Sequence, residues 1–168
     1  MLELKWFNCE VPNNLKTRQV YGVIFTNDGR TLLKVETKSN GKVFYSLAGG
    51  TPETFDKDRI ATLRRELVEE VNTTIKDEIY YVGYQQVSGD GDKPTYAQVR
   101  MTAMIDKIGE KLPDPDNDKT YDRLLTSPDR AIELLGWGEI GKNIISNAVS
   151  IAKEKFGLKL TCSDDEFV

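Results

Sequence analysis

A glycine pair followed by three acidic residues at helical spacing constrains this chain more than any other feature. An apolar run ends at Gly49 and Gly50, a short loop follows, and the next segment contains Glu66, Glu69 and Glu70. Residues three and four positions apart share one face of a helix, so a helix here would place all three carboxylates together. Like charges at this spacing repel one another, and a divalent cation can offset the repulsion because Mg²⁺ and Mn²⁺ take carboxylate and carbonyl oxygens as ligands. The pattern therefore predicts a metal-binding helix face.

Taken alone, such a pattern is more often a solvated helix face, so its context matters. That context resembles the Nudix box, whose pattern is Gly, five residues, Glu, seven residues and Arg-Glu-aliphatic-x-Glu-Glu-x-Gly-aliphatic. The segment 65–70 matches the Arg-Glu-aliphatic-x-Glu-Glu part of the pattern, and the divergent box runs from Gly50 to Thr73. Asn72 stands in the late glycine position, and Thr73 stands where an aliphatic residue is usual. Asn72 is a mild change, because asparagine ranks next to glycine at a left-handed helix C-terminus.

The first half of the box is one residue longer than the family pattern. Counted from Gly50, Asp56 occupies the early glutamate position, and eight residues then separate it from Arg65. Counted back from Arg65, Thr51 and Lys57 would occupy the glycine and glutamate positions instead. We prefer the first alignment, with the extra residue in the loop, because loops tolerate insertions whereas the helical spacing of the carboxylates does not.

Periodicity along the rest of the chain predicts alternating strands and helices, which is the pattern of an α/β fold. The predicted strands cover residues 2–7, 18–26, 31–38, 43–47, 78–87, 95–105 and 121–125. The predicted helices run from Asp56 or Asp58 to Val71, from 128 to 135, and within 138–156. The resemblance extends over about residues 18–156 and implies a Nudix-like α/β/α sandwich with a mixed β-sheet. We expect a single domain over 1–168, with residues 1–17 as a lead-in segment and the acidic residues 161–168 as a flexible tail.

The composition excludes several function classes. The net charge of −4 argues against a nucleic-acid-binding surface, which needs a basic stripe. The chain has no histidine, so Ser-His-Asp and Cys-His catalysis are excluded, and Cys9 and Cys162 have no zinc-ligand spacing. We expect two reduced thiols in a cytoplasmic protein. No stretch approaches the ~20 apolar residues of a membrane span, so we expect neither nucleic acid nor a membrane as partner and leave a homodimer open.

The resemblance implies a metal-dependent hydrolase that acts on a nucleoside diphosphate linked to another moiety, with water attacking a phosphorus of the diphosphate. The phosphorylated small molecule would be bound with Mg²⁺ or Mn²⁺. By resemblance, Glu66, Glu69 and Glu70 are the metal ligands and catalytic carboxylates, and the carbonyl of Gly50 or of Gly49 completes the metal sphere. Arg65 would serve catalysis by orienting a glutamate rather than by touching substrate.

The general base has two alternative locations in the family, a box glutamate or a carboxylate in a late loop. Asp114, Asp116 and Asp118 occupy a comparable loop, although a solvated acidic turn explains them equally well. Without histidine, the base must otherwise be another carboxylate, a lysine, a tyrosine or a water activated by a metal.

Substrate-binding residues cannot be assigned from the sequence. Several cationic and aromatic residues are candidates, but a surface cation without a role and a core aromatic are the simpler interpretations. The candidates for phosphate contact are Lys34, Lys38, Lys42 and Arg100, and those for stacking on a base are Phe25, Phe44 and Tyr45. The departures from the box pattern also leave an alternative function, a non-catalytic Nudix-fold module that binds a nucleotide or sugar-nucleotide.

Overall fold

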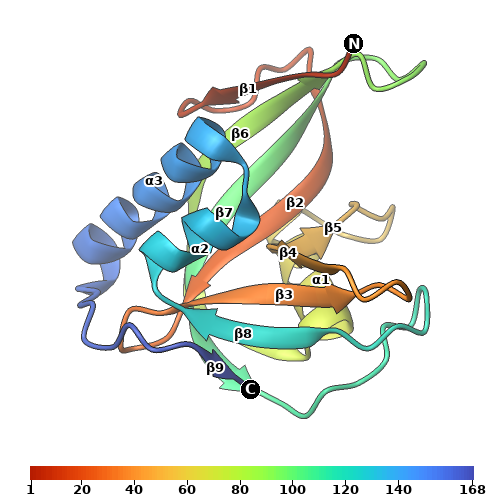
Figure 1. Ribbon diagram of the computed structural model, residues 1–168. Coiled ribbons are helices and arrows are strands. Elements are labelled where there is room, and N and C mark those ends of the chain that lie inside the picture. Colours follow the sequence, from red (N-terminus) through yellow and green to blue (C-terminus); the bar gives the residue numbers. More distant parts are fainter.

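The computed structural model describes residues 1–168 and contains one mixed sheet of nine strands with three helices (Figure 1). The strands are β1 (Glu3–Phe7), β2 (Lys16–Phe25), β3 (Thr31–Thr37), β4 (Val43–Ser46), β5 (Ala48–Gly50), β6 (Thr73–Ser88), β7 (Tyr96–Ile108), β8 (Asp122–Thr126) and β9 (Glu166–Phe167). The helices are α1 (Arg59–Val71), α2 (Pro128–Leu135) and α3 (Gly138–Phe156). Strand β6 begins directly after α1, five residues earlier than the sequence predicts, because Thr73 and Thr74 already pair with β7.

The sheet has two arms that meet at one point. Its order is β1-β6-β7-β2-β3-β8-β9, with β5 beside β2 and β4 beside β3. Strands β2 and β7 run parallel, and all other pairs are antiparallel. Strands β2 and β3 pair only where Phe25 faces Thr31. Beyond that point the arms diverge, and the short strand β5 takes the place beside β2.

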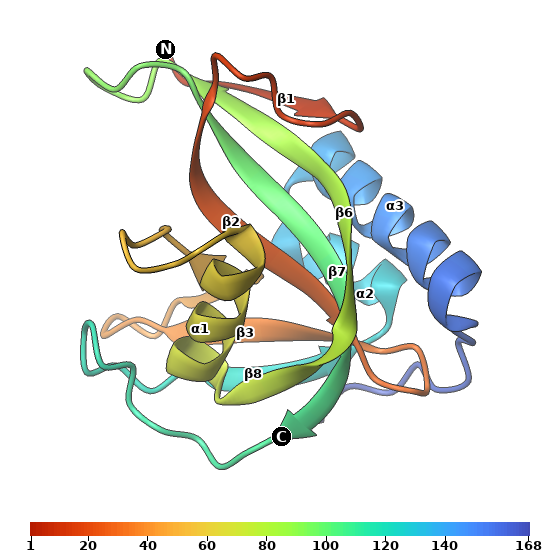
Figure 2. The same cartoon turned by 180° about the vertical axis from the view of Figure 1, so that it is seen from behind.

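Two hydrophobic clusters lie on opposite faces of the sheet. Helix α1 buries Leu63, Leu67 and Val71 against one face, because their spacing of four residues places them on one apolar stripe of the helix. Helices α2 and α3 cover the other face, where Ile144 and Ile145 lie in the second cluster. Figure 2 shows α1 in front of the sheet and α3 behind it. The predicted α/β/α sandwich with a mixed sheet is therefore confirmed.

Both ends of helix α1 are defined by side chains from the box. Asp58 is the N-cap, and its Oδ1 accepts a hydrogen bond of 2.8 Å from the amide of Ala61. Asp56, the alternative cap in the sequence analysis, instead faces Arg65. Asn72 ends the helix in the left-handed conformation with φ of 44°, as its place in the box predicts.

The left-handed conformation makes Asn72 a sensitive test of the helix end. We expect Asn72→Val to lower the free energy of unfolding by about 1–2 kcal/mol, because a β-branched residue is strained at positive φ. Asn72→Gly should stay within about 0.5 kcal/mol of the wild type, since glycine's freedom compensates for a lost hydrogen bond from the Asn72 side chain to the Glu110 carbonyl. Chemical denaturation measures both values, and equal stability of the two variants would contradict this description.

The C-terminal residues are part of the sheet, which differs from the flexible tail expected from their composition. Residues of β9 pair with β8, and the carbonyl of Val168 accepts a hydrogen bond of 3.0 Å from Nε of Arg123. Asp165 accepts a hydrogen bond from Thr126, and Glu166 forms an ion pair of 3.3 Å with Arg30. The acidic side chains thus find partners on β8 and just before β3, which composition alone cannot reveal. None of the three helices combines the length and apolar composition that crossing a membrane requires.

Candidate active site

Glu70 is held in place by strands β3 and β5. Its carboxylate is buried, and Oε1 accepts a hydrogen bond of 2.7 Å from the amide of Gly49. The ammonium of Lys34 contacts the other oxygen, Oε2. Burial raises the pKa of the Glu70 carboxyl, and Lys34 and the Gly49 amide oppose this shift. Glu70 is therefore anchored by a backbone donor and a cation.

Glu66 lies directly against Gly50. A Cβ atom built on Gly50 would lie 2.4–2.6 Å from the carboxyl atoms of Glu66, closer than real side chains approach. Only glycine fits at this position, because the Glu66 carboxylate packs directly against the backbone of Gly50. Burial raises the pKa of Glu66 to about 7, although Arg65 opposes the shift.

Arg65 connects the box helix to the preceding loop. Its Nε and Nη2 donate hydrogen bonds of 3.1 and 2.9 Å to the two oxygens of Asp56, which is a bidentate pair. Its Nη1 donates to Glu66 and Glu69 at 3.0 and 3.1 Å. The hydrogen bonds from Arg65 hold the pKa of Asp56 well below its usual range. The geometry agrees with the alignment that places Asp56 in the early glutamate position.

The late loop brings two of its three aspartates to the box helix. Carboxylate oxygens of Glu69, Asp114 and Asp116 lie within 4.8 Å of one another. Asp114 is buried, and its Oδ1 accepts a hydrogen bond of 2.9 Å from the amide of Asp116, whose side chain is exposed. Burial raises the pKa of Glu69, and Arg65 opposes this shift. Asp116 and Asp114 make smaller contributions that also raise the pKa. Asp118 is not in this cluster and adopts a left-handed turn conformation with φ of 61°.

The donor set fits a hard divalent cation. Glu66, Glu69 and Glu70 offer carboxylate oxygens from one helix face, and Asp114 and Asp116 stand beside Glu69. Oxygen-only ligand sets of this kind suit Mg²⁺ and Mn²⁺ rather than zinc. Burial is the main cause of the raised pKa values of the box glutamates, neighbouring carboxylates add to it, and a bound cation would stabilise the charged forms.

The pKa of Glu66 predicts how pH affects metal binding. A carboxyl whose pKa is raised in the folded state contributes stability below its ordinary pKa of 4.5, and this stability is lost as pH rises through about 7. Mg²⁺ competes with that proton, so its stabilising effect should be larger at pH 8 than at pH 6. Thermal unfolding with Mg²⁺ or EDTA at both pH values measures this difference. A Mg²⁺ shift that is equal at the two pH values, or one that keeps its pH dependence in Glu66→Gln, would contradict the assignment.

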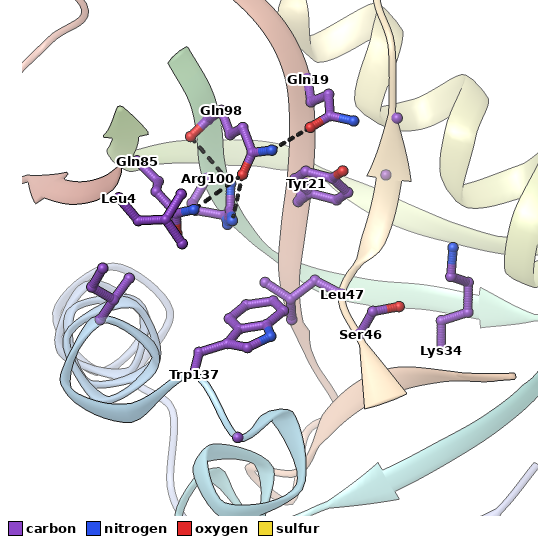
Figure 3. A pocket seen from close by; sticks show the side chains of 14 residues that line it. Leu4, Gln19, Tyr21, Lys34, Ser46, Leu47, Gln85, Gln98, Arg100 and Trp137 are labelled. Carbon is purple, nitrogen blue, oxygen red and sulfur yellow. Dashed lines mark hydrogen bonds between the residues drawn. The ribbon is translucent and has the colours of Figure 1, made fainter. Parts of the chain in front are cut away.

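A cavity of about 640 Å³ opens beside the residues that contact Glu66 and Glu70 (Figure 3). Gly49, Gly50 and Lys34 line one part of it, and Arg100 and Trp137 line another. The remaining polar lining includes three glutamines, Gln19, Gln85 and Gln98. A cavity of this size accommodates a substrate of nucleotide dimensions.

The structure separates the phosphate and stacking candidates of the sequence analysis into two groups. Lys34 and Arg100 line the cavity, and Arg100 is buried rather than on the surface. The others lie elsewhere: Lys38, Lys42 and Phe44 are exposed, Tyr45 is half-buried and Phe25 is a core residue. Trp137 and the glutamines were not predicted. For Gln98 and Arg100 a signal existed, namely the polar side chains at alternate positions of β7, which lie on the face that α2 and α3 cover.

Comparisons with known proteins agree with the fold. The chain is similar to a NUDIX hydrolase from Listeria monocytogenes, with a TM-score of 0.62 and 15% identity over 83% of this chain and 96% of that one. It is also similar to the ORF135 protein of E. coli, with a TM-score of 0.58 and 18% identity over 87% and 98% of the two chains. The match to a Bacillus subtilis pyrophosphohydrolase has a TM-score of 0.52 and 18% identity and spans 64% of this chain and 63% of that one. No curated protein sequence matches significantly. The family model described as NUDIX domain matches residues 15–145, and the chain therefore belongs to the Nudix family.

Proposed function

We propose that the protein is a metal-dependent hydrolase of a nucleoside diphosphate linked to another moiety. One observation carries the proposal: the helix face of Glu66, Glu69 and Glu70 contacts Gly49, Gly50 and Lys34, and these three residues line a cavity large enough for a nucleotide. Family membership supports hydrolysis of a pyrophosphate-containing substrate. Mg²⁺ or Mn²⁺ held by these carboxylates and the Gly50 carbonyl would offset the charge of the diphosphate and acidify a nearby water.

The residues of the chain would orient the diphosphate and keep the carboxylates apart from solvent. Lys34 lies at the cavity and contacts Glu70, so its ammonium is available both to the carboxylate and to a phosphate oxygen. Arg65 holds Glu66 and Glu69 in fixed positions while Asp56 fixes the guanidinium itself. Arg65 is therefore a positioning residue.

In the reaction, the oxygen of water forms a bond to one phosphorus, and the bond from that phosphorus to the bridging oxygen breaks. The bridging oxygen leaves with the other phosphate, and the proton of the water passes to a carboxylate. Asp116 suits this role because its side chain is exposed and accepts no hydrogen bond, whereas Glu69 accepts one from Arg65. Asp114 is less available as a base, since its Oδ1 already accepts a hydrogen bond from the Asp116 amide.

Turnover of a panel of nucleoside-diphosphate derivatives tests the proposal. We expect phosphate-containing products in the presence of Mg²⁺ or Mn²⁺ and none with EDTA. The triple variant Glu66→Gln/Glu69→Gln/Glu70→Gln should lose both turnover and the metal-dependent rise in Tm. Tight binding of a panel member without turnover would favour the non-catalytic binding module instead. An unchanged metal response in the triple variant would refute the metal site.

The loop aspartates offer a matched pair of variants. We expect Asp116→Asn to lower kcat by about tenfold to a hundredfold, less than a glutamine at Glu69 or Glu70, because solvent or Asp114 can replace a loop base. Asp118→Asn should keep the wild-type rate, since Asp118 lies outside the cluster and asparagine tolerates its positive φ. Steady-state kinetics with saturating Mg²⁺ measures both. A loss above about a thousandfold in Asp116→Asn, with metal affinity intact, would make Asp116 the sole base and reverse the ranking.

A further inference from the structure

Arg100 is a buried cation without a counter-charge. It lies on β7 and is only 3% exposed. Its Nη1 donates a hydrogen bond of 3.1 Å to the Gln98 carbonyl, and Nη2 makes a long contact of 3.4 Å with the Gln98 side chain. Its Nε has no hydrogen-bond partner, and no carboxylate forms an ion pair with it. An unpaired buried charge opposes folding, so its presence needs an explanation.

The surroundings of Arg100 hold its guanidinium without satisfying it. The rings of Tyr21 and Trp137 lie with their centroids 4.7 and 5.8 Å from the guanidinium carbon. Such contacts attract the cation and fix its orientation, but they do not use its N–H groups. Burial lowers the pKa of Arg100 to about 10, so the group remains charged at neutral pH. Arg100 is one of the residues that line the cavity (Figure 3).

Arg123 shows how the same fold treats a structural arginine. It is 4% exposed, and its N–H groups donate to the carbonyls of Val71, Gly109 and Val168 at 2.9, 2.6 and 3.0 Å. Buried arginines that only support the fold are satisfied in this way. Arg100 departs from this pattern at the one place where a large cavity opens.

The charged side chains that line the cavity are cations, although the chain is acidic. Among its lining residues, only Lys34 and Arg100 are charged, whereas the whole chain has a net charge of −4. The two cations line different parts of the cavity, with Tyr21, Leu47 and Ser46 between them in the view of Figure 3. The Lys34 end adjoins Gly49 and Gly50 and hence the box carboxylates. A ligand that fills the cavity would therefore meet cationic groups at both ends.

We propose that Arg100 binds a second anionic group of the substrate, a carboxylate or a phosphate that is separate from the diphosphate. The Nε and Nη2 edge of a guanidinium matches two oxygens of such a group, which would neutralise the buried charge and occupy the unused donor. Side-chain amides of Gln19, Gln85 and Gln98 offer neutral hydrogen bonds to the part of the molecule between its ends. The placement of the diphosphate at the other end rests on the proposed function.

Protein stability distinguishes a binding role from a structural one. Arg100→Met replaces the cation with an apolar side chain of similar length and should give a Tm at least as high as that of the wild type. Arg123→Met is the matched control, and it should lower Tm because three carbonyl groups lose their donor. A fall in Tm of Arg100→Met as large as that of Arg123→Met would assign Arg100 to the fold and overturn the inference.

Matched ligand pairs test the anionic group itself. UDP-glucuronate and UDP-glucose differ by a carboxylate, and NADP⁺ and NAD⁺ differ by a phosphate, so the two pairs separate the two chemistries. With Mg²⁺ present, calorimetry should show that the more anionic member of at least one pair binds about tenfold or more tightly, the ratio that a charge-assisted hydrogen bond supplies. Arg100→Met should abolish this ratio, whereas Arg130→Met, which removes an exposed charge outside the cavity, should keep it.

The outcomes separate this inference from the proposed function. Equal or undetectable binding of both members of both pairs overturns the second anion site, and so does a ratio that survives Arg100→Met. Hydrolysis of panel substrates without any such ratio would leave the hydrolase intact and refute only the anion site. A ratio that depends on Arg100, with no turnover of any ligand, would support the anion site and refute the hydrolase.

Discussion

Replacing Glu70 with glutamine is expected to lower kcat by about a thousandfold, at the upper end of the loss caused by removing one preorganised electrostatic contact in an active site. The substitution keeps the size of the side chain, so its oxygen can still accept the hydrogen bond from the Gly49 amide. It removes the negative charge that contacts Lys34 and would bind a cation. Burial already raises the pKa of this carboxyl, so stability should change little without metal.

Steady-state kinetics and thermal unfolding of the same preparation measure both effects. Glu53→Gln is the matched control, because Glu53 is an exposed glutamate of the loop that precedes helix α1. We expect wild-type kcat in the control and a Mg²⁺-dependent rise in Tm only in the control and the wild type. Retention of more than about a tenth of the activity in Glu70→Gln would remove Glu70 from the catalytic machinery.

Gly50→Ala is expected to abolish most of the activity, by about a hundredfold or more, although the change adds one methyl group. The added Cβ would meet the Glu66 carboxyl group at 2.4–2.6 Å, so Glu66 or strand β5 must move. A movement of Glu66 displaces a carboxylate, and a movement of β5 displaces the Gly50 carbonyl that we propose as a metal ligand. The Mg²⁺-dependent rise in Tm should therefore shrink together with kcat.

Two further variants separate this collision from general strain. Gly91→Ala places a methyl group in open space at positive φ, so it should cost about 1 kcal/mol of stability and leave the metal response unchanged. In Gly50→Ala/Glu66→Ala the collision partner is absent, so the double variant should be more stable than Gly50→Ala but equally inactive. Normal kinetics of Gly50→Ala would show that the close approach has no role in the site.

The fold could be predicted largely from local signals. The extents of α2 and α3 follow from a proline at the start of one helix and glycines after both, and the caps at Ser127, Gly136 and Gly157 are those that such sequences favour. The strand over residues 166–167 could not be predicted, because two residues are too few to show the alternation of polar and apolar side chains that indicates a strand. Its formation depends on β8 and on partners such as Arg30 that lie far away in the sequence.

The part of the candidate site that depends on helical spacing could be predicted. The part that depends on contacts between distant segments could not. Glu66, Glu69 and Glu70 share one segment, so their common face follows from the period of the helix. The meeting of Asp116 with Glu69 depends on the path of a loop that no local rule fixes. The sequence does not indicate that Arg100 is buried, because Trp137, which lies close to it in the fold, belongs to the distant segment between α2 and α3.

The pairing of Asp56 with Arg65 has a consequence for how divergent copies of this motif are found. Aspartate is one methylene shorter than the glutamate of the family pattern, and one more residue separates it from the arginine. Even so, both of its oxygens reach the guanidinium at 3.1 and 2.9 Å. The contact between the acid and the arginine is therefore preserved, although the number of residues between them differs from the family pattern. A search that fixes the count discards such chains, whereas one that asks which acid can touch the arginine, with one residue of slippage, retains them.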